Sequence, residues 1–246
     1  MNIELEVKSL KIGSYNIKHG SDNGRYCEGI GKLLRENDLD IIGIQEIDCF
    51  VNRSGNIDVL KEIASAGNYH YYKFYKTINY QNGDYGLGII SKYPFETISV
   101  TKLSHCKEQR LIVLAEVDIN GFKMNFLVTH FELGTYEDVR KFQFIEVKNI
   151  LKDLKYFVLT GDFNVQNWNE PGNFFEIGKH FDDYKILNNP HNTFLTYSGK
   201  ECIGGGILPI DNIIVSNNID FTKTYMVDTD YSDHDLLIGE ISLSLS

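Results

Sequence analysis

Short apolar runs rich in Ile, Val and Phe recur along the sequence, with turn residues between them. Runs of this length and composition predict β-strands. We expect strands at residues 10–16, 41–46, 87–92, 110–118, 122–129, 156–161, 209–216 and 236–243. No helix is predicted within 87–101 or within 110–129, so we expect antiparallel hairpins in both segments.

Three other segments predict helices, at about 26–37, 57–66 and 136–154. Asn56 is the expected N-cap of the second helix and Gly67 its stop, because these residue types favour those positions. Thr135 should open the third helix, with Asp138 three residues later. Five apolar residues of the third helix share a face that should pack on a sheet: Val139, Phe142, Val147, Ile150 and Leu154.

The order of these elements favours layers of sheet and helix around a shared core. Antiparallel strand pairs, together with a helix before the strand at 156–161, indicate a mixed layer order. The simplest architecture is an α+β fold in which two mixed, mostly antiparallel sheets pack face to face with helices outside. Neither a repeat nor a Pro/Gly linker interrupts the sequence, so we expect residues 1–246 to form a single domain. The Asn- and Gly-rich segment 188–208 is predicted to be a surface loop.

The composition is that of a packed globular protein. Hydrophobic residues make up 42% of the 246 residues, with 15 Tyr and 15 Phe. The segment 1–18 alternates charged and apolar side chains without the apolar run of a signal peptide, so we expect a cytoplasmic protein. The cysteines form no C-x-x-C pair, which predicts free thiols at Cys27, Cys49, Cys106 and Cys202.

The formal net charge of −10 bears on the kind of partner that the protein binds. Non-specific binding to a polyanion needs many Lys or Arg side chains to displace counterions from phosphates. Long duplex nucleic acid is therefore disfavoured as a partner. A locally positive cleft or a bound divalent cation would alter this balance, because the formal count includes neither.

Polar residues stand at the ends of several predicted strands. They are Asn16, Glu46, His130, Asp162, Asn164, Asp211, Asp233 and His234. A charged group at the end of a buried strand costs roughly a few kcal/mol unless it is solvated, paired or metal-bound. Taken singly, Asn16, Asp162 and Asp211 could be turn residues. Glu46 could likewise be a solvated strand end, but so many polar strand ends indicate a common partner.

The motifs around these residues carry a resemblance to a known family. I-Q-E and T-H end two strands, G-D-F-N follows another and S-D-H precedes the last. In these motifs the chain resembles the endonuclease/exonuclease/phosphatase superfamily, which includes DNase I, abasic-site nucleases, sphingomyelinases, inositol polyphosphate phosphatases and deadenylases. The resemblance runs from about Lys11 to Glu240 and includes GLGIISKYPF at 86–95 and Arg140 with Gln143.

The resemblance implies a DNase I-like four-layer α/β sandwich and a hydrolase that cleaves a phosphoester with Mg²⁺ or Mn²⁺ and water. Mg²⁺ prefers oxygen ligands and binds through one or two carboxylates. Glu46 is the best candidate ligand, with Asn16 as its amide neighbour and Asp233 as a further candidate. Several members of the family carry an Asp where this chain has Lys18. Since a cation there repels Mg²⁺, we expect a single-metal site at Glu46.

The resemblance also implies roles around the phosphate. Asp162 would orient or deprotonate the attacking water, and Asn164 would hold a phosphate oxygen. Asp211 would accept a hydrogen bond from His234 and raise the pKa of the imidazole, so that it faces the phosphate in its protonated form. His130 would lie on the other side of the same phosphate.

Two arginines, Arg53 and Arg110, suit substrate contact, although a surface salt bridge is the role expected for each taken alone. The expected substrate is a small phosphodiester, a nucleotide, or single-stranded or short nucleic acid, hydrolysed by a monomer without stable membrane association. A sphingomyelinase-like hydrolase of phospholipid head groups and a catalytically silent binding domain are the alternatives. A zinc protease is disfavoured because the sequence contains no H-E-x-x-H.

Overall fold

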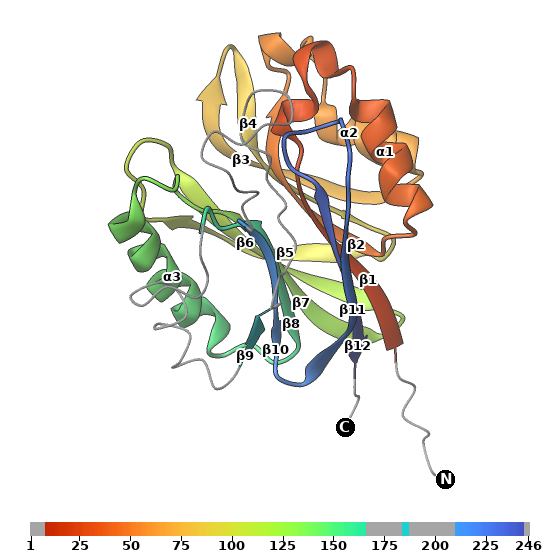
Figure 1. The fold of residues 1–246 in the computed structure, drawn as a ribbon, viewed down its shortest axis with the longest axis vertical. Helices are drawn as coiled ribbons and strands as arrows, with labels where there is room; N and C mark the ends of the chain where they lie inside the picture. Colours follow the sequence, from red (N-terminus) through yellow and green to blue (C-terminus); the bar gives the residue numbers. More distant parts are fainter. Residues whose placement is uncertain (1–7, 166–183, 187–209, 244–246) are drawn as a thin grey trace.

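Two six-stranded sheets form the centre of the computed structural model, which describes residues 8–165, 184–186 and 210–243 (Figure 1). Across the first sheet the strands are β11 (Ile219–Val227), β12 (Leu236–Leu243), β1 (Lys8–Asn16), β2 (Ile41–Cys49), β4 (Gly83–Ser91) and β3 (Tyr71–Tyr80). Across the second they are β5 (Phe95–Leu103), β6 (Arg110–Ile119), β7 (Phe122–His130), β8 (Phe157–Asp162), β10 (Asp211–Ser216) and β9 (Tyr184–Ile186). Only β1 with β2 and β7 with β8 pair in parallel among these strands.

Helices lie on the outer faces of the two sheets (Figure 1). The helices α1 (Cys27–Glu36) and α2 (Val59–Gly67) pack on the first sheet, and α3 (Glu137–Leu151) packs on the second. Short 3₁₀ turns, η1 (Lys18–Gly20), η2 (Asp22–Gly24) and η3 (Asn52–Ser54), complete the described elements. The predicted α+β sandwich of two mixed sheets with helices outside is therefore confirmed. Among the described residues no helix is both long and apolar enough to cross a bilayer.

The hydrophobic core has three parts, which follow from the alternation of side chains along each strand. In β1, Leu10 and Ile12 face the second sheet, whereas Tyr15 belongs to the cluster beneath α1 and α2. In β8, Val158 faces the first sheet and Leu159 packs beneath α3. Each central strand is thus buried on both faces, which explains why the sequence shows continuous apolar runs there.

One of the two predicted hairpins is present. β6 and β7 form an antiparallel pair, and Asn120 and Gly121 in their turn have positive φ values of 53° and 92°, as a tight hairpin turn requires. The hairpin expected within 87–101 is wrong, because β4 pairs with β2 and β3 while β5 pairs with β6 in the other sheet. The chain crosses between the sheets there, and the Tyr93 amide donates to Ser91 Oγ at 2.9 Å in the connecting turn.

The helix ends differ from the prediction by a few residues. The N-cap of α2 is Asp58, which accepts the Lys61 amide at 3.1 Å, rather than Asn56. Gly67 is the last residue of this helix, and Asn68 takes the left-handed conformation after it. At the start of α3, Tyr136 rather than Thr135 precedes the helix and makes no side-chain cap.

The packing face of α3 is also displaced from the predicted one. Val147, Ile150 and Leu154 pack with the second sheet as expected, but Phe142 is 60% exposed. Phe144 takes its place in the core, beside Phe131 and Phe163. Cys27, Cys49 and Cys106 are free thiols, as predicted. Cys202 and the segment 188–208 lie outside the described residues.

We expect Gly43→Ala to lower the free energy of unfolding by about 1–3 kcal/mol, because overpacking of a dense core costs this much. Gly43 on β2 faces the second sheet, and a Cβ atom there would stand 2.0 Å from Thr160 Oγ1. Urea denaturation followed by circular dichroism measures the effect. Val100→Ala on the exposed face of β5 is the control and should change the value by less than about 0.5 kcal/mol. Equal stability of the glycine variant and the wild type would contradict this account of the sheet packing.

Candidate active site

The inner faces of the two sheets change from apolar to polar at one end of the sandwich. In β1 the inward row Leu10 and Ile12 continues to the fully buried Ser14 and Asn16. In the second sheet, β7 ends at His130, β8 ends at Asp162 and β10 begins at Asp211. The register places both His130 and Asp211 directly beside Asp162. Strand geometry alone therefore brings these three predicted residues together.

Asn16 links the two sheets. Its Nδ2 donates to Glu46 Oε1 at 3.0 Å and to Asp162 Oδ2 at 3.1 Å, while its Oδ1 accepts the Lys18 amide at 3.1 Å. Ser232 Oγ donates to the Asn16 backbone carbonyl at 2.7 Å and holds the S-D-H loop against β1. Asn16 is 1% exposed, so its bonds fix the relative positions of two carboxylates from different sheets.

A β-bulge places Glu46. The register of β2 with β4 shifts between Ile44 and Ile47, both of which belong to the core beneath α1 and α2. Glu46 lies between them with φ of +58°, a conformation that non-glycine residues adopt at a cost. Regular alternation would direct Glu46 toward the helices with Ile44. The bulge instead brings its half-buried carboxylate to the Asn16 amide.

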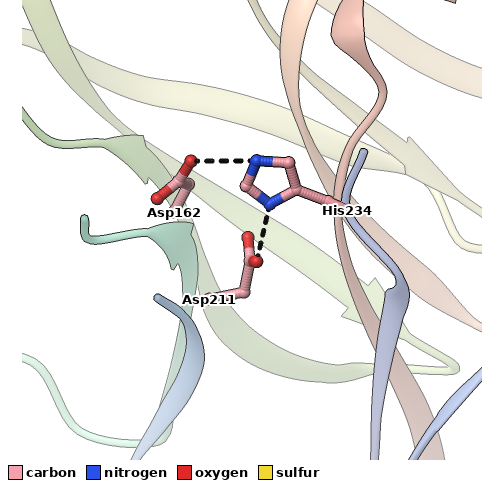
Figure 2. A group of neighbouring side chains, drawn as sticks. All are labelled: Asp162, Asp211 and His234. Carbon is pink, nitrogen blue, oxygen red and sulfur yellow. Dashed lines mark hydrogen bonds and ion pairs between the residues drawn. The ribbon is translucent and has the colours of Figure 1, made fainter. Parts of the chain in front are cut away.

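The imidazole of His234 lies between two buried carboxylates (Figure 2). Its Nδ1 is 2.8 Å from Asp211 Oδ2, and its Nε2 is 3.7 Å from Asp162 Oδ2. Burial lowers the pKa of His234, but the charge and hydrogen bond of Asp211 and the charge of Asp162 outweigh burial and raise it to about 10. A pKa in this range keeps His234 protonated at neutral pH.

Asp162 is 2% exposed. Burial and the neighbouring charge of Asp211 raise the pKa of Asp162 to about 7, although His234, Asn16 and the Asn164 amide act in the opposite direction. A carboxyl group with its pKa near neutrality can both accept and release a proton at physiological pH.

Asp162, Asp211 and His234 also have ligand atoms within 4.8 Å of one another, close enough to hold a metal ion. A metal-bound histidine must be neutral, however, whereas Asp211 keeps His234 protonated through its hydrogen bond to Nδ1. We therefore interpret the three residues as a proton network in which the Nε2 of His234, 3.7 Å from Asp162, remains able to donate to a ligand.

His130 is in a different protonation state from His234. Its Nε2 lies 3.5 Å from Asp162 Oδ2. Burial, Arg110 and His234 hold the pKa of His130 well below its usual value, so its imidazole is neutral. The two histidines beside Asp162 thus offer a charged and an uncharged hydrogen-bonding group.

Asn164 is fixed by the end of β7. Its backbone amide donates to Asp162 Oδ1 at 2.9 Å, and its Nδ2 donates to the Phe131 carbonyl at 3.1 Å. The residue has φ of +52°, which asparagine tolerates better than most residues. Its side chain is half-buried next to Asp162.

The remaining metal candidate, Asp233, forms an ion pair with Lys18 at 2.9 Å. Both side chains are partly exposed. Its charge is thus already compensated, which makes Asp233 a weaker candidate ligand than Glu46.

Both predicted substrate-binding arginines are held by buried carboxylates. Arg53 donates to Asp48 from Nε at 2.8 Å and from Nη2 at 2.9 Å. Arg110 lies 3.1 Å from Glu108 and 3.6 Å from Glu132. Asp48 and Glu132 are fully buried, so each arginine has one fully buried carboxylate partner, whereas the Glu108 side chain is partly exposed.

Three of these acidic partners, Asp48, Glu108 and Glu132, were not predicted from the sequence. Asp48 stands two residues after Glu46, and Glu132 stands two residues after His130. In both cases an acidic residue lies two positions after a predicted site residue. This spacing was the signal available in the sequence. Glu108 lies in the connection between β5 and β6 and has no such signal.

Comparison with known proteins places the chain among phosphoesterase-like folds. A family model described as the Endonuclease/Exonuclease/phosphatase family matches residues 13–234. A family protein from Bacteroides thetaiotaomicron has 18% identity and a TM-score of 0.71 over 98% of this chain and 100% of that chain. No curated protein sequence matches the chain significantly.

Two further solved structures are similar in fold. D. rerio TDP2 complexed with a single-strand DNA product has 15% identity and a TM-score of 0.73 over 95% of this chain and 99% of that chain. A mannosyl-6-phosphatase from Bacteroides thetaiotaomicron has 19% identity and a TM-score of 0.64 over 94% of this chain and 99% of that chain.

We expect Asp211→Asn to lower the pKa of His234, because the charge and hydrogen bond of Asp211 are the main causes that raise it. The imidazolium of the wild type persists until pH approaches about 10, and its stabilising effect is lost as pH rises through that value. In the variant, the loss of the imidazole proton and the loss of its stabilising effect should both occur at lower pH. Imidazole ¹⁵N shifts across a pH titration measure the pKa, with Asp138→Asn on the exposed start of α3 as the control. An unchanged His234 titration would show that the two residues are not coupled.

Proposed function

The chain belongs to the endonuclease/exonuclease/phosphatase family, and from this membership and the geometry of the site we propose that it hydrolyses a phosphoester with water and Mg²⁺ or Mn²⁺. The family comprises phosphoester hydrolases, which generally depend on a divalent metal. The observation that carries the proposal is the position of the Asn16 amide, which contacts Glu46 and Asp162 at once. One amide nitrogen therefore donates both to the candidate metal ligand, Glu46, and to the candidate base, Asp162.

Glu46 suits a hard cation. Its carboxylate is half-buried, and one oxygen accepts from Asn16. Within the described part of the chain it forms no ion pair, so its charge remains for another partner. Mg²⁺ favours such sites because it binds one or two carboxylates and keeps several water molecules. When bound, the cation would neutralise charge on the phosphate and help to activate water.

Asp162 orients the attacking water and accepts its proton. The water oxygen forms a bond to phosphorus, the released proton passes to the Asp162 carboxylate, and the bond between phosphorus and the leaving oxygen breaks. The electron pair of that bond goes to the leaving oxygen. The pKa of Asp162, raised by burial, matches this role at neutral pH.

The other predicted residues stabilise the phosphate. His234, kept protonated by Asp211, donates to a non-bridging oxygen whose negative charge grows during the reaction. Asn164, fixed by Phe131, and the neutral His130 donate to the same phosphate. Asn16 keeps Glu46 and Asp162 in their relative positions.

The substrates named for the similar structures support two kinds of phosphoester, since one structure contains a single-strand DNA product and another is a mannosyl-6-phosphatase. We propose that this chain acts as a single-domain monomer on a small molecule or on single-stranded or short nucleic acid. Arg53 and Arg110 border the substrate, and the protein works in the cytoplasm without stable membrane association.

We expect Glu46→Gln to weaken the apparent affinity for Mg²⁺ and to lower turnover, because the charged oxygen supplies most of the attraction to a hard cation. Titration of Mg²⁺ into wild type and variant, read by hydrolysis of p-nitrophenyl phosphate and bis(p-nitrophenyl) phosphate, measures the effect. Glu96→Gln on the exposed face of β5 is the matched control. An unchanged apparent affinity would remove Glu46 from the metal site.

We expect Asp162→Asn to lower kcat by about 10²–10⁴, which is the typical contribution of a general base. Stability should respond differently, because the pKa of Asp162 is raised from 3.8 to about 7 and its ionised form is therefore penalised in the folded state. The penalty is absent below pH 3.8, where the carboxyl group is protonated in both the unfolded and the folded state. It is complete above about pH 7, where the carboxyl group is ionised in both states. The Tm of the variant relative to wild type should therefore be higher at pH 8 than at pH 5.

Circular dichroism melts in EDTA at both pH values and steady-state kinetics at pH 8 make the two measurements. Asp153→Asn on the surface after α3 serves as control. A normal kcat in Asp162→Asn would show that the G-D-F-N segment is a structural turn and not part of the active site.

A further inference from the structure

A second group of polar side chains, Glu108 with Arg110, takes no part in the bond cleavage proposed above. Tyr85 pairs with Asp48 across β4 and β2, so its side chain stands next to the strand end that carries Glu46. Burial, Glu46 and Glu108 all raise the pKa of Tyr85. Burial also raises the pKa of Glu108, with a further contribution from Glu46 and an opposing one from Arg110. Arg110 lies 3.1 Å from Glu108 and 3.6 Å from Glu132, which stands two residues after His130 at the end of β7, so the pair lies at the same end of the second sheet as the candidate site.

The segment that carries Glu108 is anchored. Glu132 accepts the backbone amides of Cys106 at 2.9 Å and Lys107 at 3.4 Å. Glu146 accepts both the amide and the hydroxyl of Ser104, at 2.9 Å and 2.7 Å. Gln143 Nε2 donates to the Ser104 carbonyl at 2.7 Å. Three of the six residues between β5 and β6, Ser104, Cys106 and Lys107, are thus tied to α3 and to Glu132 after β7, and this anchoring limits the movement of the adjacent Glu108.

Glu108 and Arg110 differ in the hydrogen-bonding groups that remain available to a ligand. The Glu108 side chain is 29% exposed, so its carboxylate can accept from a ligand while it contacts Arg110 Nη1. Arg110 is 4% exposed, and its Nε–H has no hydrogen-bond acceptor among the described residues. A buried donor without an acceptor is costly, so a water molecule or a ligand is expected to complete it. The pair thus combines an accessible acceptor with an unsatisfied donor.

Three cations near the candidate site, within the part of the chain that the structure describes, are each paired with a carboxylate and are poorly placed to bind a long polyanion. Arg53 is neutralised by Asp48, Arg110 by Glu108 and Glu132, and Lys18 by Asp233. Arg53 is also covered by an aromatic ring, with its guanidinium 4.5 Å from the centre of Tyr80. Binding along a nucleic acid strand needs cations that are not already paired with carboxylates. An alcohol hydroxyl, by contrast, both donates and accepts and suits such a paired acceptor and donor.

We propose, resting on the function proposed above, that Glu108 and Arg110 bind hydroxyl groups of the alcohol part of the substrate. The substrate is then a phosphate ester of a sugar or another polyol. Glu108 accepts from one hydroxyl, and Arg110 donates to the same or a neighbouring one. Specificity arises in this arrangement because an alcohol without hydroxyl groups leaves both polar side chains unsatisfied.

The test compares kcat/KM for glucose 6-phosphate and mannose 6-phosphate with that for p-nitrophenyl phosphate, whose leaving group has no further hydroxyl, and with a short oligothymidylate. Wild type should prefer a sugar phosphate. Glu108→Gln should lower kcat/KM for that sugar phosphate at least about tenfold more than for p-nitrophenyl phosphate, because a hydrogen bond to a charged group is lost. Glu116→Gln on β6, which pairs with Lys123 at the surface, is the matched control and should change neither.

Calorimetric titration of the preferred sugar phosphate in EDTA gives a readout that does not depend on turnover. Its Kd should weaken about tenfold in Glu108→Gln. If circular dichroism shows that this variant does not fold, Glu108→Asp, which keeps the charge beside Arg110 but shortens its reach, takes its place with the same expectation.

Failure of the two proposals is distinguishable. If wild type hydrolyses none of these esters, nor bis(p-nitrophenyl) phosphate, the proposed function is wrong. If it hydrolyses p-nitrophenyl phosphate but prefers the oligothymidylate or shows no preference for sugar phosphates, the inference is overturned. Equal losses on both kinds of monoester in the Glu108 variant, or an unchanged Kd, would overturn it as well.

Discussion

The burial of Asp162 between two sheets is the constraint on which the polar end of the sandwich depends. A carboxylate at 2% exposure needs donors on every side, and the surrounding strands supply them. Asn16 reaches it from the other sheet, and the Asn164 amide reaches it from the following turn. Because Asp211 adds a second negative charge in the neighbouring strand, a cation must lie between the two, and His234 is that cation.

Much of the fold could be predicted from the sequence because the central strands are buried on both faces and read as apolar runs. The edge strands β3 and β11 were not predicted, since Tyr, Lys and Thr on both faces weaken the alternation that marks a strand. The hairpin within 87–101 failed for another reason. Strand propensity does not reveal when a chain leaves one sheet for the other, because that choice depends on distant partners.

The candidate site, like the fold, could be predicted from the sequence only in part. Polar strand ends are visible in the sequence, and the structure brings Asn16, Glu46, His130, Asp162 and His234 together. The bulge at Glu46 is not visible, because it depends on a register that only the paired strands define. The buried pairs of Arg53 with Asp48 and of Arg110 with Glu132 were likewise hidden. Ion pairs depend on tertiary proximity, which residue type alone does not give.

The pairing of β1 with β12 has a consequence for the synthesis of the protein. Residues 8–14 pair with residues 237–243, and the S-D-H loop just before β12 completes the site through Ser232 and His234. More than 200 residues therefore separate the two partners along the chain, and contacts of such long sequence separation form slowly. Until residues 232–243 have been synthesised, the candidate site lacks Ser232 and His234, and β1 has an unpaired edge on the side that β12 covers.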